Sequence, residues 1–183
     1  MIWKNTSQRY SSISIALHWL MFILIVAVYA CIELRELYPK GSETRDMLKT
    51  WHFMLGLSVL LLVLVRLVAR FVSGTKPAII PPLAPWQAFL ANLAHYALYG
   101  LMLGMPIAGW LILSLAGKPI PFFGFELPAL AAENKELSKQ IKEIHATIGT
   151  LGYYLIGLHA LAALIHHYIL GDSTLRRMLP SKK

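Results

Sequence analysis

Histidine is the residue type most suggestive of chemistry in this chain, because its histidines lie within or beside long apolar stretches. The seven are His18, His52, His95, His145, His159, His166 and His167. An ionisable side chain inside a membrane is costly, and imidazole is the commonest protein ligand for metals. For any one of these histidines, a hydrogen bond between helices is the alternative explanation. The spacing of the set must therefore decide between the two.

Two of the histidines share one face of a helix. His145 and His159 are fourteen residues apart, which is about 40° short of four full turns and a rise of about 21 Å. Each has a counterpart at the matching depth of another apolar stretch, His52 for His145 and His18 for His159. The spacing predicts two stacked sites, each built from two imidazoles on two helices.

Haem iron suits a site with two imidazoles, because it takes one axial ligand on each face of the porphyrin. Zinc would need further donors, and we find no Cys, Asp or Glu at these depths within the apolar stretches. Nearby glycines leave room for a flat macrocycle, although helix packing explains them equally well. Arg66 follows His52 by fourteen residues and is predicted to hold a haem propionate. A side chain that extends to the lipid headgroups is the alternative for Arg66.

Four membrane-spanning helices must position these residues. Of the 183 residues, 57% are hydrophobic and 14% are charged, whereas soluble domains have about 45–50% and about 25%. Four stretches reach the roughly 20 apolar residues that a span needs. They predict an all-α transmembrane bundle that forms a single domain over 1–183, with helices at about 11–34, 46–72, 86–115 and 134–170. Asn134 is a candidate N-cap of the last helix, and Pro106 is expected to kink the third.

Charge and cysteine content exclude several other classes. The single cysteine, Cys31, rules out an intramolecular disulfide and a cysteine-based zinc or iron–sulfur site. The net charge of +8 does not indicate a nucleic-acid partner, because the basic residues lie between apolar runs. Four spans place both termini on one side, with nine basic residues and one acid there, against eight basic and eight acidic residues on the other. We take the side with the termini as cytoplasmic.

Several short motifs, spread over nearly the whole chain, match one known family. They are IALHW at 15–19, ELR at 33–35, PKG at 39–41, FGF at 123–125, IHAT at 144–147, LHA at 158–160, HHY at 166–168 and DSTLRRMLP at 172–180. In these motifs the sequence resembles the bacterial cytochrome b561 family, specifically its small four-helix, two-haem members, which include superoxide:ubiquinone oxidoreductases. The resemblance implies a multi-pass inner-membrane protein with cytoplasmic termini and two haem b groups.

The resemblance also implies the ligands and the reaction. His18 and His159 would bind the cytoplasmic-side haem, and His52 and His145 the periplasmic-side haem. Superoxide would give its electron on the periplasmic side and leave as oxygen, and ubiquinone would accept electrons from the second haem. No obligate protein partner is evident, and membrane lipid is the surrounding solvent. The alternative function is a cytochrome b subunit that anchors a hydrogenase or dehydrogenase to the quinone pool; a non-haem metal transporter is disfavoured because no intramembrane carboxylate accompanies the histidines.

Substrate residues are suggested by their positions near the ligands. Lys49 and Lys142 each precede a predicted ligand by three residues, about one helical turn outward, and are predicted to attract superoxide. Ordinary lysines that extend to the membrane surface would look the same. His166 and His167 are predicted to bind quinone, with interfacial histidines as the alternative. His95 is expected to be structural or close to the quinone, because no histidine of the fourth span remains to pair with it.

Overall fold

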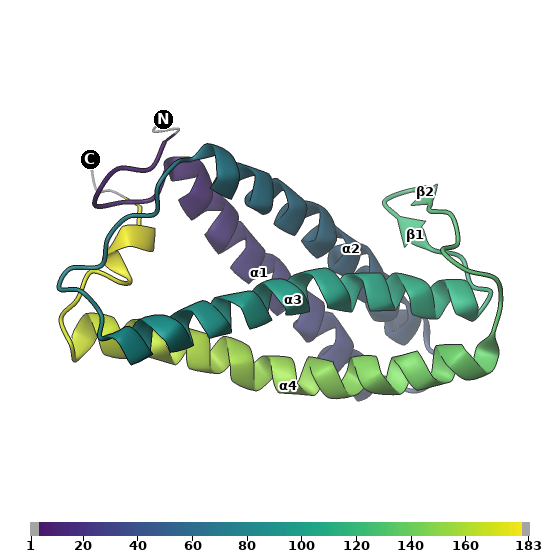
Figure 1. Ribbon diagram of the computed structural model, residues 1–183. Coiled ribbons are helices and arrows are strands. Elements are labelled where there is room, and N and C mark those ends of the chain that lie inside the picture. The colour runs from purple at the N-terminus through teal and green to yellow at the C-terminus, as the bar shows by residue number, and fades with distance from the viewer. Residues whose placement is uncertain (1–3, 181–183) are drawn as a thin grey trace. The chain divides into compact units, whose positions relative to one another are not determined.

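The computed structural model describes residues 4–180 and contains four long α-helices. They are α1 (Ser12–Leu34), α2 (Glu43–Val72), α3 (Pro85–Leu115) and α4 (Lys135–Tyr168), labelled in Figure 1. All four are long and apolar enough to cross a membrane, so the predicted fold class is confirmed. The shorter elements are the 3-10 helices η1 (Arg35–Leu37) and η2 (Arg176–Met178) and the strands β1 (Pro121–Phe122) and β2 (Phe125–Glu126). Lys182 and Lys183, which entered the charge comparison, lie outside the described residues.

Local capping sets where the helices begin. α2 begins at Glu43, earlier than predicted, because the hydroxyl and carbonyl oxygens of Ser42 accept hydrogen bonds from backbone N–H groups of the first turn. Asn134 caps α4 as predicted, its side-chain oxygen accepting from the N–H of Leu137 at 3.0 Å. α3 continues through Pro106 as one helix, and the kink expected at this proline stays a prediction.

By their internal contacts the residues form two compact units. Unit 1 comprises Met1–Leu20, Leu64–Gly100 and Gly152–Lys183, and unit 2 comprises Met21–Val63 and Leu101–Leu151. Each helix contributes residues to both units, since the boundaries fall inside α1, α2, α3 and α4.

Unit 1 joins three segments that are far apart in the chain. The indole N–H of Trp19 on α1 donates to the carbonyl oxygen of Met178 at 2.8 Å. Ser173 binds the α2–α3 linker twice, because its N–H donates to the carbonyl of Ile80 and its hydroxyl accepts from the N–H of Ile80. The C-terminal segment is therefore fastened both to the start of α1 and to this linker.

Unit 2 has its packed core beside the hairpin of β1 and β2. Leu57, Leu113 and Ile120 are buried together there, and the indole N–H of Trp110 donates to the carbonyl oxygen of Pro128 at 2.9 Å. This cluster fixes the segment between α3 and α4 against α2, the helix that carries His52.

Candidate functional site

In unit 2 the structure brings together His52 of α2 and His145 of α4. Their ring centroids are 6.4 Å apart, with the ring planes at 78°. Nδ1 of His52 lies 3.0 Å from the carbonyl oxygen of Val28. A carbonyl oxygen can only accept, so Nδ1 carries the proton and Nε2 of the neutral ring is free to bind a metal. Nδ1 of His145 is buried and has no hydrogen-bond partner among the described residues.

Residues beside His145 restrict its surroundings. A Cβ atom placed on Gly109 of α3 would lie 3.7 Å from Cε1 of His145, so only a small residue leaves the ring its present position. Gly149 lies one turn after His145 on α4, and its carbonyl oxygen accepts a hydrogen bond from the hydroxyl of Tyr29 at 2.8 Å. This bond fixes α1 to the part of α4 that carries the histidine.

In unit 1 the structure brings together His18 of α1 and His159 of α4. Their ring centroids are also 6.4 Å apart, with the planes at 68°. Nη2 of Arg66 lies 3.1 Å from Nδ1 of His18. A guanidinium can only donate, so Nδ1 of His18 accepts and the proton of the neutral ring is on Nε2. The two pairs thus have the same ring separation. The tautomers of His52 and His18 differ, because the proton is on Nδ1 in His52 and on Nε2 in His18.

His95 of α3 is a third histidine in unit 1. Its ring centroid lies 5.5 Å from that of His159, with the planes at 74°. The expectation that His95 has no histidine of the fourth helix as a neighbour is therefore wrong. The prediction matched histidines by their depth in the membrane and gave each one a single partner. In the structure, the ring of His159 contacts histidines of both α1 and α3.

The separation of 6.4 Å in both pairs suits one metal ion between two imidazoles. A metal–nitrogen bond of about 2 Å and a further 1 Å or so to each ring centre give about 6 Å between the centroids. Among residues 4–180 no group of three or more His, Cys, Asp or Glu side chains is placed to hold a metal ion. The donor set therefore fits an iron whose remaining ligands come from a porphyrin.

His166 has a partner that the sequence interpretation missed. Its Nδ1 lies 2.6 Å from Oδ2 of Asp172, and the other carboxylate oxygen accepts from the N–H of Thr174 at 2.8 Å. The Asp172 residue is only 4% exposed. Burial by itself would raise the pKa of Asp172, but the hydrogen bonds from Thr174 and His166 outweigh it and hold the pKa below its usual value. The available signal was that Asp172 is the one acid on its side of the predicted topology.

His167 is placed differently from His166. Its ring packs against that of Tyr168 with centroids 4.7 Å apart, and its buried Nδ1 has no hydrogen-bond partner among the described residues. The two adjacent histidines therefore have separate surroundings.

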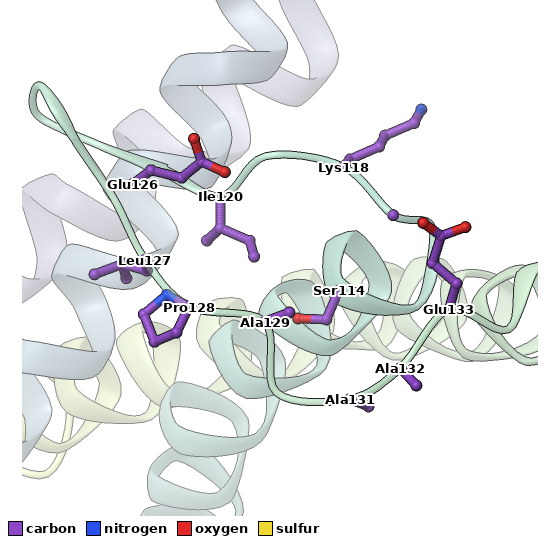
Figure 2. Close-up of a pocket in the computed structure, with 11 residues that line it drawn as sticks. Ser114, Lys118, Ile120, Glu126, Leu127, Pro128, Ala129, Ala131, Ala132 and Glu133 are labelled. Atoms are coloured by element: carbon purple, nitrogen blue, oxygen red, sulfur yellow. The ribbon is translucent and has the colours of Figure 1, made fainter.

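Lys49 belongs to a larger basic group in unit 2. Its ammonium is repelled by Lys118, Arg35 and Lys142, and is attracted by Asp46. Sequence reasoning selected Lys49 and Lys142 but missed Lys118, which is 69 residues from Lys49 and follows the end of α3. Figure 2 shows Lys118 on the loop after α3. Lys118 lines a pocket of about 610 Å³ there. No histidine lines that pocket, so it is separate from the histidine pairs.

Comparison with known proteins decides the family. The family model for prokaryotic cytochrome b561 matches residues 9–181. The chain belongs to the prokaryotic cytochrome b561 family. Accordingly, it is a membrane electron-transfer protein of the bacterial inner membrane that crosses the bilayer several times and binds haem b.

Three relatives resemble this cytochrome b561 along nearly their full length. "Cytochrome b561 homolog 1" of Escherichia coli K12 is 39% identical over 176 residues, which cover 96% of this chain and 99% of the relative. "Probable superoxide oxidase CybB" of Yersinia pestis is 36% identical over 176 residues, with 96% and 98% covered. "Cytochrome b561 homolog 2" of Escherichia coli K12 is 32% identical over 187 residues, with 98% and 95% covered.

Proposed function

We propose that this cytochrome b561 holds two haem b groups and oxidises superoxide with ubiquinone as the electron acceptor. His52 and His145 would bind one haem, and His18 and His159 the other. The observation that carries the proposal is the 6.4 Å ring separation, found independently in the two pairs. Haem b would supply one-electron chemistry there, and the paired histidines are the residues that would hold its iron.

A backbone carbonyl and a side chain of the protein prepare the ligands in two ways. The carbonyl of Val28 holds His52 in the tautomer whose Nε2 can bind iron. His18 needs Nε2 free as well, so the guanidinium of Arg66 must leave Nδ1 when the site is loaded. A haem propionate is the anion that would then take over the guanidinium, in agreement with the role predicted for Arg66.

Superoxide would approach the basic group of unit 2. The reaction balances as two superoxide ions, one ubiquinone and two protons giving two molecules of oxygen and one ubiquinol. Lys49, Lys118 and Lys142 concentrate an anion near the His52–His145 pair by electrostatic attraction. The name of the Yersinia pestis relative, a probable superoxide oxidase at 36% identity, supports this choice of donor.

The His166–Asp172 pair suits a quinone, because quinone reduction takes up protons as well as electrons. Asp172 holds the ring through Nδ1, so Nε2 of the neutral ring would accept a hydrogen bond, and Nε2 of the protonated ring would donate one to a quinone carbonyl. The buried Nδ1 of His167 is a second candidate donor or acceptor. This assignment goes with the predicted cytoplasmic termini, since the pair lies in unit 1, in which α1 begins and α4 ends.

The first experiment measures the haem content and then the activity of the purified protein. We expect two haem b per chain and a reduced-minus-oxidised spectrum of the b type. Superoxide should then reduce added ubiquinone at a rate that depends on the protein. Two haems without superoxide-driven quinone reduction would favour the alternative function, an electron-transfer subunit for a hydrogenase or dehydrogenase, and one haem or none would refute the di-haem proposal.

A charge-removal series tests the route of superoxide. The triple variant K49Q/K118Q/K142Q should lower the rate at low ionic strength by about tenfold and flatten its salt dependence. The control is K135Q/K139Q, which removes two positive charges from the exposed start of α4 and should leave the rate and its salt dependence nearly unchanged. Equal rates and equal salt dependence in the wild type and the triple variant would contradict the role of these lysines.

A further inference from the structure

A group of basic side chains in unit 1 has a single acidic residue near it. Asp172 attracts Arg177 without forming an ion pair with it, and no other acidic residue occurs in the segments that form this unit. Arg70 comes from the last turn of α2, Lys76 from the linker after it, and Arg177 from η2. The ion pairs formed within residues 4–180 involve none of these three cations.

Arg177 is the buried member of the group and has an unused donor. It is 6% exposed, its Nη1 donates to the carbonyl oxygen of Pro77, and its Cζ lies 5.7 Å from the ring centre of Tyr10. Its Nε is buried and has no acceptor among the described residues. A buried N–H of a charged group is costly without an acceptor, so an oxygen ligand from outside the chain would stabilise it.

Lys76 and Arg70 add further positive charge around this position. Burial lowers the pKa of Lys76, and repulsion by Arg70 and Arg177 lowers it further. The Cζ atom of Arg70 lies 5.7 Å from the ring centre of Tyr99, which holds the guanidinium at the end of its helix. Gathering three like charges is unfavourable, and an anion among them reverses the sign of that interaction.

The group lies where a bilayer presents phosphate. It is built from the end of α2 and the linker that leads to α3. In the first turn of α3, Trp86 is 64% exposed, and in the last turn of α2, Phe71 is 83% exposed. Exposed aromatic side chains at the ends of membrane-spanning helices mark the interface with the headgroups and offer contacts for acyl chains.

We propose that Arg70, Lys76 and Arg177 bind the phosphate of an anionic phospholipid as a specific site. The lipid supplies the acceptor oxygen for Nε of Arg177 and neutralises the cations, and its acyl chains lie against the exposed apolar side chains of α2 and α3. Specific binding of this kind differs from the general solvation of the spans by lipid, because it selects the headgroup by charge.

Native mass spectrometry of the detergent-purified protein with added phosphatidylglycerol or phosphatidylcholine tests the site. We expect retention of phosphatidylglycerol in preference to phosphatidylcholine. Each basic side chain near an anionic lipid is worth about fivefold in affinity, so R70Q/K76Q should weaken retention by about 30-fold. K135Q/K139Q removes the same charge from the exposed start of α4 and should retain the lipid.

Haem content, measured on the same samples, separates a lipid phosphate from a haem propionate as the anion. We expect R70Q/K76Q to keep the wild-type haem content. Loss of haem with phosphatidylglycerol retained would overturn the proposal in favour of a propionate, and so would equal lipid retention in the two double variants. If R70Q/K76Q does not fold, the site is tested by comparing K76Q with the wild type. Phosphatidylglycerol should raise the wild-type Tm at low salt only, and K76Q should reduce that rise. A Tm that responds equally to both lipids would refute the site.

Discussion

The two histidine pairs are expected to respond unequally to the loss of one ligand. Unit 2 contains no histidine other than His52 and His145. His145→Ala therefore leaves His52 with no replacement imidazole, and haem content should fall from two per chain to one. In unit 1, His18→Ala leaves His159 with His95 still beside it.

The ring separations in unit 1 indicate how much haem His18→Ala should keep. The His95 and His159 ring centroids are 5.5 Å apart, against 6.4 Å for His18 and His159. A shift of about 1 Å would bring His95 to the 6.4 Å separation of the His18–His159 pair, which suits two imidazoles on one metal ion. His18→Ala should then keep between one and two haems per chain, part of them in a low-spin form, and H18A/H95A should fall to one.

The assay is a haem determination per chain combined with the visible spectrum of the oxidised and reduced protein. Far-UV circular dichroism of each variant separates loss of haem from loss of the fold. If His145→Ala keeps two haems, the ligand assignment in unit 2 is wrong. Equal haem contents in H18A and H18A/H95A would show that His95 cannot substitute, and that the contact with His159 serves packing alone.

Three further outcomes are expected. In Gly109→Leu the new side chain should collide with His145, and the protein should lose one haem. Gly109→Ala should keep both haems, because a Cβ atom would lie 3.7 Å from the ring. The haem content of the two variants tests this difference. In Asp172→Asn the protein loses a hydrogen-bonded charge beside His166, so the free energy of unfolding, measured against pH, should be lower by about 2 kcal/mol. Because the folded pKa of Asp172 lies below its unfolded value, that deficit is complete above the ordinary carboxyl pKa of about 4 and disappears as the pH falls through the folded value. Trp110→Phe should lower stability by about 1 kcal/mol without changing haem content, because it removes one hydrogen bond to a backbone carbonyl.

Helical periodicity and apolar length carried much of the prediction. They gave the four spans, and they matched His52 with His145 and His18 with His159, which the structure brings to equal ring separations. These features repeat along a helix axis, so a sequence can report them directly. Whether the four histidines bind haem iron stays a prediction.

What the sequence did not reveal depends on rotation about helix axes and on the paths of loops. Depth along α3 placed His95 correctly within a span but not on the face that meets His159. The bond between Asp172 and His166 requires the turn at Gly171, whose φ of +70° glycine adopts readily. The proximity of Lys118 to Lys49 depends on how the segment after α3 folds back. None of these has a periodic signal.

The hydrogen bond from His52 to the carbonyl of Val28 has a consequence for how this protein can change over evolution. Every amino acid carries that carbonyl, so a substitution at position 28 does not by itself remove the acceptor that sets the His52 tautomer. At His18 the corresponding neighbour is the side chain of Arg66, which one mutation can replace. The tautomer of His52 is therefore protected against side-chain substitution, whereas the tautomer that His18 adopts beside Arg66 is not.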